Sequence, residues 1–269
     1  MQLEDLIPFL IPAAFVTLIA VERLRPARPL PRVRGWRASG VVAFLVTGVV
    51  SSSVPLLYQD FIQRNRLLDL TGLGLPVGAL MAFLATELAG YWFHRLRHTR
   101  LLWPIHQLHH SAERLDVFGS AYFHPLDIAG ETLVGSLAST LLLGVSGEAA
   151  ALAGLAAVCL SLFQHTNVRT PRWLGYIIQR PESHSVHHAR GVHAFNYADL
   201  PLWDIVFGTF RNPARFESEA GFWDGASRRL WAMLLGRDVT CPPEPVAGKQ
   251  LTAARAASIR PPEEAAQQV

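Results

Sequence analysis

The 269 residues are half hydrophobic and only 17% charged, with a mean hydropathy of +0.23. Soluble domains carry about 25% charged residues, so this balance excludes an ordinary water-soluble globule and a disordered chain. The two cysteines, Cys159 and Cys241, are too few for a disulfide framework and have no C-x-x-C spacing. Metal binding must therefore depend on imidazole, and the chain carries eleven histidines.

The basic residues are concentrated beside the first apolar stretch. The chain has a formal net charge of +3, and six arginines fall within fifteen residues: Arg23, Arg25, Arg28, Arg32, Arg34 and Arg37. Arginine next to a membrane span fixes its orientation and meets anionic headgroups, whereas nucleic-acid binding requires a basic face on a soluble fold. We therefore expect a lipid bilayer and no nucleic acid as partner.

Four apolar stretches follow one another along the chain, at 6–21, 41–58, 75–93 and 128–163. The first three have the ~17–25 residues that a membrane helix needs once their flanks are counted. The fourth is twice as long and is interrupted near Gly144 and Gly147, which predicts a helical hairpin of two spans. The expected fold is an all-α polytopic membrane protein with about four to five membrane helices.

The positive-inside rule orients these spans. It places the arginine-rich loop 22–40 in the cytoplasm, the loop 59–74 outside, and segment 94–127 back in the cytoplasm. Whether the hairpin spans twice or is only re-entrant, it returns the chain to the side it left, so the N-terminus is expected outside and everything after Gln164 in the cytoplasm. All eleven histidines then lie on the cytoplasmic side or at its boundary.

Three regions are expected along the chain. Residues 1–74 hold the N-terminal membrane helices, and residues 75–240 form a catalytic domain whose cytoplasmic helical cap holds a histidine-rich dimetal site. Residues 241–269, rich in proline and alanine, are expected to be a disordered tail.

The histidines form three clusters with helical spacing. Residues three and four apart share one face of a helix, so each cluster directs two rings at one ion. The middle histidine of each H-x-x-H-H triplet can address a second ion. The clusters are His94 and His98; His106, His109 and His110; and His184, His187 and His188.

Two further histidines flank the predicted hairpin. His165 follows it and His124 precedes it, so both are expected as ligands. An isolated histidine such as His193 is more typical of a hydrogen-bonded or exposed side chain. A zinc ion takes four ligands, so nine or ten histidines predict two ions.

The identity of the metal follows from exclusion and from the setting. Neither H-E-x-x-H nor H-x-x-E-H occurs, so a zinc membrane protease lacks its general base. Imidazole binds iron, zinc, copper and nickel alike. Two redox ions facing a bilayer suit dioxygen activation beside an unreactive C–H bond, which favours two irons, with zinc able to replace them in a purified protein.

The order of the three clusters resembles the fatty acid hydroxylase and sterol desaturase superfamily of integral-membrane di-iron enzymes. The resemblance extends over residues 75–211 and includes further motifs: Tyr91-Trp92-Phe93-His94-Arg95, Leu102-Trp103, His110-Ser111, Phe123-His124-Pro125, Asn196-Tyr197, Trp203-Asp204 and Phe207-Gly208-Thr209. Ser161 stands where the fatty acyl branch has an extra histidine, so the pattern is nearer to the sterol and alkylglycerol branches.

The resemblance implies an enzyme that uses dioxygen to hydroxylate or desaturate a lipid. It also implies that the eight clustered histidines and His165 are the metal ligands, and His124 matches the sterol-like branch. No cytochrome b5 domain and no flavin or nicotinamide fingerprint is found in the chain. Electrons are therefore expected from a separate cytochrome b5-like or ferredoxin-like protein.

Three polar residues are expected to support the ligands. A metal-bound imidazole usually donates its other N–H to a carboxylate, amide or carbonyl group. Glu87 lies two helical turns before His94 on the same face, and Asn196 and Asp204 follow the last cluster. For Asp204, a helix cap or an ion pair with arginine is an equally good interpretation.

Two other classes of protein compete with an enzyme. One is a histidine-rich membrane metal transporter or storage protein, and the other is a non-catalytic metal-binding membrane protein. Transport requires ligands near the bilayer midplane and on both sides, and the predicted membrane interiors carry none.

Overall fold

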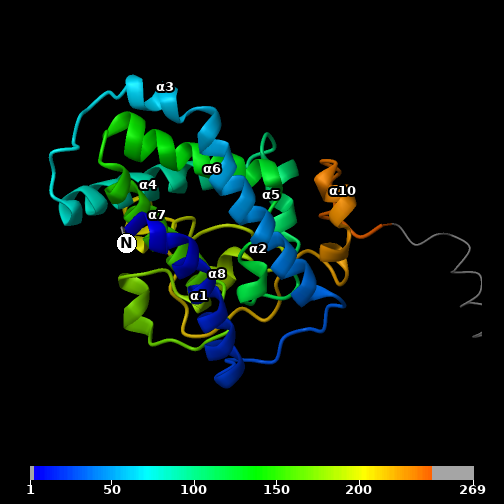
Figure 1. The fold of residues 1–269 in the computed structure, drawn as a ribbon. Coiled ribbons are helices and arrows are strands. Elements are labelled where there is room, and N and C mark those ends of the chain that lie inside the picture. Colours follow the sequence, from blue (N-terminus) through cyan, green and yellow to red (C-terminus); the bar gives the residue numbers. More distant parts are fainter. Residues whose placement is uncertain (1–2, 244–269) are drawn as a thin grey trace, which may run out of the picture.

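The computed structural model describes residues 3–243, which form helices and loops without a strand in that range (Figure 1). The long helices are α1 (Leu3–Leu24), α2 (Trp36–Ser53), α4 (Leu75–Arg97) and α7 (Gly147–Gln164). The shorter elements are η1 (Val54–Leu57), α3 (Gln59–Arg64), α5 (Trp103–His110), η2 (Val117–Gly119), α6 (Pro125–Ser136), η3 (Leu137–Leu142), η4 (Arg172–Tyr176), α8 (Pro181–His187), α9 (Pro201–Val206), η5 (Ala226–Arg228) and α10 (Leu230–Leu234). Residues 244–269 of the predicted tail lie outside the described residues.

Four helical segments are long and apolar enough to cross a membrane. They are Leu6–Leu24, Trp36–Leu57, Leu75–Arg97 and Gly147–Gln164. Their outer faces carry large apolar side chains such as Phe9 and Val49, which are 72% and 66% exposed. Exposure of such apolar surfaces is favourable in lipid and unfavourable in water, so the all-α membrane fold is confirmed.

The predicted hairpin over 128–163 has two unequal arms. The second arm is α7, whereas the first consists of the twelve-residue α6 followed by the π-helix η3. The first arm is not one of the four span-length segments. The predicted break is present: Gly144 has a φ of 58°, and the Ser146 hydroxyl accepts a bond from the Ala149 N–H at the start of α7.

Prolines mark where several helices begin. α4, α5, α6, α8 and α9 each have proline in their first turn, where the missing N–H costs no hydrogen bond. The starts of α4, α5 and α8, the three helices that contain clustered histidines, are therefore indicated by the sequence. Pro8 and Pro12 lie inside α1 instead, a position that membrane helices tolerate.

Small residues bring the central helices together. α4 packs along α7 through Ala79, Ala82, Ala149 and Ala153, all of them buried. Without a hydrophobic driving force in lipid, close backbone approach at small residues is the main source of helix association. The pairing of α4 with α7 brings together the helix ends that carry His94 and His165.

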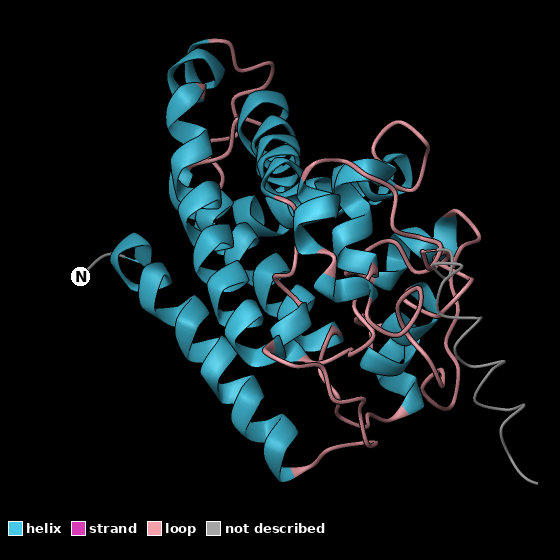
Figure 2. Cartoon of the chain, turned by 90° about the vertical axis from the view of Figure 1, so that its right-hand side faces the viewer, coloured by secondary structure: helices cyan, strands magenta, loops and turns pink. Residues whose placement is uncertain are grey.

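A loop-rich cap covers one end of the long helices. Figure 2 shows the long helices gathered on one side of the molecule and the short helices with their loops on the other. Trp36 at the start of α2 packs against Tyr122 and donates its indole N–H to Asp116 at 2.8 Å. The cap is therefore anchored on the same helices that form the membrane region.

Candidate metal centre

Nine histidines converge where the cap meets the ends of α4 and α7. Each ring comes from the last turn or the C-cap of a helix, or from the short helix α5. His94 and His98 end α4; His106, His109 and His110 belong to α5; His165 caps α7; His184 and His187 belong to α8, and His188 caps it.

The nine rings divide into two groups. Within each group one nitrogen of every ring lies within 4.8 Å of the corresponding atom of the others. Group 1 contains His94, His98, His106, His110 and His187, and group 2 contains His109, His165, His184 and His188. In each H-x-x-H-H triplet the residues four apart share a group, and the middle histidine joins the other group.

The ring nitrogens are spaced as ligands of a shared ion. In group 2 the Nε2 atom of His165 lies 3.2 Å from that of His109 and 3.1 Å from that of His184. Two nitrogens bound at about 2.1 Å to one ion and separated by roughly 90–110° lie about 3.0–3.4 Å apart. In group 1 the Nε2 atoms of His106 and His110 are 3.1 Å apart, the same spacing.

Several of these nitrogens have no other partner. The Nε2 atoms of His94, His98 and His187, all in group 1, are buried without a hydrogen bond to any described residue. A buried polar atom without a partner lowers the free energy of unfolding by roughly 1–3 kcal/mol, so three such atoms would destabilise a protein that gave them no partner. Metal coordination satisfies all three, and the residues present thus fit a metal ion.

Backbone carbonyls orient three of the nine rings. The Nδ1 atoms of His94, His187 and His165 lie 2.6, 2.7 and 2.6 Å from the carbonyl oxygens of Tyr197, Phe195 and Ser161, respectively. A proton on Nδ1 then leaves the Nε2 lone pair available to a metal. Each of these rings is held in the tautomer that a ligand requires.

Burial keeps the rings uncharged. It lowers the pKa of His98 to about 2, with repulsion from His106 adding to the effect, and it lowers the pKa of His165 to about 4. Burial and neighbouring rings also hold the pKa values of His109, His110 and His188 well below 6.5. Neutral imidazole is the form that binds metal, so the cluster is ready for ligation at neutral pH.

One carboxylate contacts a ring directly, and sequence analysis did not identify it. The Nδ1 atom of His106 lies 2.8 Å from Asp127, which is fully buried in the first turn of α6. Asp127 also accepts a bond from Arg97 at 3.0 Å, and Arg97 pairs in turn with Glu131. An acidic residue in a first helical turn is common, so only the fold reveals that this one faces a histidine.

The three predicted supporting residues act one step further from the rings. Glu87 accepts the Leu200 N–H at 2.8 Å, and Asp204 accepts the N–H groups of Tyr197 and Ala198 at 2.8 and 3.0 Å. The Asn196 amide donates to Ser183 and Arg211 and accepts from the Arg211 N–H. All three hold segment 195–200, whose carbonyls at 195 and 197 orient His187 and His94.

That segment has an unusual backbone. His193, Phe195 and Asn196 have φ values of 41°, 67° and 48°, in the left-handed region that non-glycine residues rarely adopt. The Asn196 side-chain bonds stabilise this conformation, which turns two carbonyls toward the histidines. These hydrogen bonds thus offset the strain of the left-handed backbone.

The structure does not bring His124 to either group. Its Nδ1 accepts the Leu126 N–H at the start of α6, and its Nε2 lies 3.2 Å from the Leu234 carbonyl. His193 is placed closer to the centre than its isolation in the sequence indicates, because its Nδ1 lies 3.2 Å from that of His110 in group 1. Its sequence context gave no signal of this contact.

A cavity of about 300 Å³ connects the histidines with the membrane helices. Its inner end is lined by His94, His106, His109, His165 and His184. Its outer walls come from every long helix and from α6, with Ile11, Phe44, Thr86, Ile128 and Val158 among them. A volume near the lower end of the usual range of about 300–1,000 Å³ suits a slender part of a ligand, such as an acyl chain.

Comparison with known proteins places residues 79–209 in register with the family model described as fatty acid hydroxylase. An ornithine lipid hydroxylase of Rhizobium tropici is 34% identical over 142 residues, which cover 51% of this chain and 42% of that protein. Human alkylglycerol monooxygenase is 32% identical over 134 residues, covering 48% of this chain and 29% of the human protein.

Lathosterol oxidase of Mus musculus is 29% identical over 154 residues, which cover 54% of this chain and 48% of the mouse protein. The match therefore spans less than half the length of each of these relatives. No solved structure matches the chain. The matched region contains all three histidine clusters and His165.

Proposed function

We propose that this chain, whose residues 79–209 match the family model described as fatty acid hydroxylase, is a member of that family and an oxygen-dependent di-iron enzyme that hydroxylates or desaturates a membrane lipid. The observation that carries the proposal is the placement of two histidine groups at the inner end of a cavity walled by membrane helices. The names of the relatives, a lipid hydroxylase, an alkylglycerol monooxygenase and a sterol oxidase, support a lipid as substrate.

Each histidine group would hold one iron. Group 1 offers five rings and group 2 offers four, and His165 completes group 2. When bound, the two irons supply the redox chemistry that activates dioxygen for attack on an unreactive C–H bond. His124 stays outside the proposed ligand set, because both of its ring nitrogens contact backbone groups.

The remaining contributions come from the chain itself. Asp127 and the carbonyls of Ser161, Phe195 and Tyr197 fix the orientation of four rings, which would leave their Nε2 atoms free to hold a metal ion. The cavity would position the lipid carbon beside the histidines and exclude water from it. Glu87, Asn196 and Asp204 support this arrangement through segment 195–200.

The proposed orientation places the N-terminus outside and the histidines in the cytoplasm. The Ala27 N–H donates to the Asn167 carbonyl at 2.8 Å, so the arginine-rich loop lies on the same side as His165. The positive-inside rule assigns that side to the cytoplasm. A separate cytochrome b5-like or ferredoxin-like protein would deliver electrons there, and residues 75–240 would form the catalytic domain.

The geometry disfavours a metal transporter. The nine histidines lie at the ends of α4 and α7 and in the cap, all on one side of the span-length segments. A transport path needs ligands near the midplane of the bilayer. A non-catalytic metal-binding protein has the same geometry and is separated from an enzyme by experiment.

The test supplies ¹⁸O₂ to cells that produce the chain and analyses their lipids and the iron content of the purified protein. Hydroxylation inserts one ¹⁸O atom into a lipid C–H bond, whereas desaturation removes two hydrogens and leaves the oxygen in water. His109→Asn should abolish the product and remove one of two irons, and His124→Asn, which preserves the helix cap, should retain both. Two bound irons without any changed lipid in cells that contain a suitable reductase would refute catalysis.

A further inference from the structure

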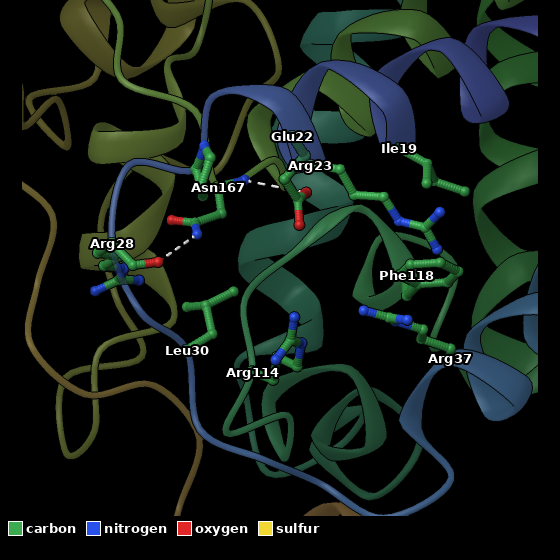
Figure 3. A pocket seen from close by; sticks show the side chains of 10 residues that line it. Ile19, Glu22, Arg23, Arg28, Leu30, Arg37, Arg114, Phe118 and Asn167 are labelled. Atoms are coloured by element: carbon green, nitrogen blue, oxygen red, sulfur yellow. Dashed lines mark hydrogen bonds between the residues drawn. The ribbon is translucent and has the colours of Figure 1, made fainter.

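A second cavity lies away from the histidines, between the end of α1 and the start of α2. It has a volume of about 230 Å³ and is drawn in Figure 3. Its apolar wall is formed by Ile19, Leu30 and Phe118, and four arginines border it: Arg23, Arg28, Arg37 and Arg114. Nothing in the proposed oxidation chemistry requires this site.

Two of the four arginines are already engaged. The guanidinium of Arg28 lies 4.6 Å from the centre of the Phe216 ring and donates to the Glu217 carbonyl. Arg114 pairs with Asp116 and donates to the Pro31 carbonyl at 3.1 Å. Their positive charges are therefore directed at groups of the protein.

The other two arginines carry charge that the protein leaves unmatched. Neither Arg23 nor Arg37 makes an ion pair or a side-chain hydrogen bond with any residue in the described range 3–243. In Figure 3 their heads lie on either side of Phe118, and Arg37 extends toward Arg114. The cavity thus presents converging positive groups beside an apolar wall.

The single carboxylate of the cavity does not neutralise them. Glu22 is 9% exposed, and its Oε2 atom accepts the backbone N–H groups of Val117 and Asn167 at 3.0 and 3.2 Å. It ties the end of α1 to η2 and to the segment after α7. Among the lining side chains, positive charge remains in excess.

The position of the cavity indicates where its ligand comes from. Arg23 is the second-last residue of the span Leu6–Leu24, and Arg37 is the second residue of the span Trp36–Leu57. Both side chains therefore lie at the boundary where lipid phosphates are found, and basic residues there attract anionic lipid. The volume is below the usual range of about 300–1,000 Å³, so the cavity suits a headgroup better than a whole lipid.

We propose that this cavity binds the phosphate of an anionic membrane lipid, with Arg23 and Arg37 contacting the phosphate and Ile19, Leu30 and Phe118 contacting the adjoining glycerol and acyl carbons. The inference depends on the membrane placement of α1 and α2 and is independent of the iron chemistry. Free inorganic phosphate is also an anion but has no apolar part, so it would not use the apolar wall.

Native mass spectrometry of the purified full-length protein in detergent can test the site with phosphatidylglycerol, phosphatidylcholine and inorganic phosphate as probes. The pocket variant is Arg23→Gln with Arg37→Gln. The matched control is Arg25→Gln with Arg32→Gln, which removes two charges from the segment between α1 and α2 at positions that are exposed, as Arg23 and Arg37 are, but do not line the cavity. Arg23→Lys with Arg37→Lys keeps the charge, and metal content reports whether each variant folds.

We expect the pocket variant to bind phosphatidylglycerol on the order of tenfold more weakly, since each basic residue near an anionic lipid contributes appreciably to binding. The control should change less than about twofold, and the lysine variant should recover most of the affinity. Equal losses in pocket variant and control, or no loss in either, would overturn the proposal. Displacement of the lipid by millimolar phosphate would overturn the lipid assignment in favour of a free-anion site.

Discussion

Asp127→Asn is the most informative single change at the metal centre. Asp127 is fully buried and contacts both His106 and Arg97. The substitution keeps the size of the side chain but removes the negative charge that orients the His106 ring and pairs with the Arg97 guanidinium. The His106 ring then loses its preference for the tautomer that carries the proton on Nδ1 and leaves the Nε2 lone pair free in group 1. Arg97 keeps one acidic partner, Glu131.

The size of the effect follows from these contacts. Loss of a carboxylate that orients a ligating histidine weakens metal binding by roughly 10–100-fold. Breaking a buried ion pair costs about 3–5 kcal/mol, and the lower end applies because Glu131 remains beside Arg97. We therefore expect one of two irons to be released easily and the unfolding free energy to fall by about 3 kcal/mol.

The assay is chelator competition on the purified protein, with iron counted per chain, alongside denaturant unfolding in detergent. Glu131→Gln is the matched control: it removes another carboxylate from Arg97, but its side chain is 45% exposed and no bond to a histidine is found. It should retain both irons and lose about 1 kcal/mol or less. If the two variants lose iron equally, or neither does, Asp127 does not orient His106 and the reasoning is refuted.

Three further outcomes are expected. Gly40→Ala places a methyl group 2.6 Å from the Cβ and the carbonyl oxygen of Phe118, so the unfolding free energy should fall by about 1–3 kcal/mol. The control is Gly48→Ala in the same helix, where no atom lies within 4 Å and the substitution should be neutral or stabilising. Asn196→Ala removes three hydrogen bonds from the left-handed segment, and metal analysis should show that iron is released from group 1 first. Tyr197→Phe should not release iron, because the His94 ring contacts the backbone carbonyl of residue 197, which the substitution leaves in place. The metal-free protein should become less stable as the pH falls from about 6.5 to 4. Burial lowers the pKa of His165 and His193 to about 4, so only the unfolded chain takes up protons on these two rings in that interval. A series of thermal unfolding measurements that shows no change across this pH range would contradict the burial of neutral rings.

Local patterns in the sequence accounted for the helices and for the histidine groups. Spacings of three and four on a helix determine which rings share a face, and the apolar stretches determine which helices can span a membrane. His106 and His110 accordingly share one group, with His109 in the other. The break near Gly144 could be predicted for the same reason, since it depends only on neighbouring residues.

Contacts between distant segments could not be predicted in this way. Asp127 meets His106 across 21 positions, and the Tyr197 carbonyl meets His94 across 103. Neither partner is marked by a local pattern, because an acidic residue at a helix start and a backbone carbonyl occur everywhere. His193 likewise lies beside His110, from a segment whose left-handed residues His193, Phe195 and Asn196 are not glycines.

The use of backbone carbonyls to orient His94, His165 and His187 has a consequence for how this chain can vary. A point mutation replaces a side chain but leaves the carbonyl in place, so positions 161, 195 and 197 can change residue type while still accepting the same hydrogen bond. Ser161 also lines the cavity, so a substitution there can reshape the cavity without removing the bond to His165. A change in the shape of the cavity and retention of the hydrogen bond that orients His165 are thereby compatible at one position.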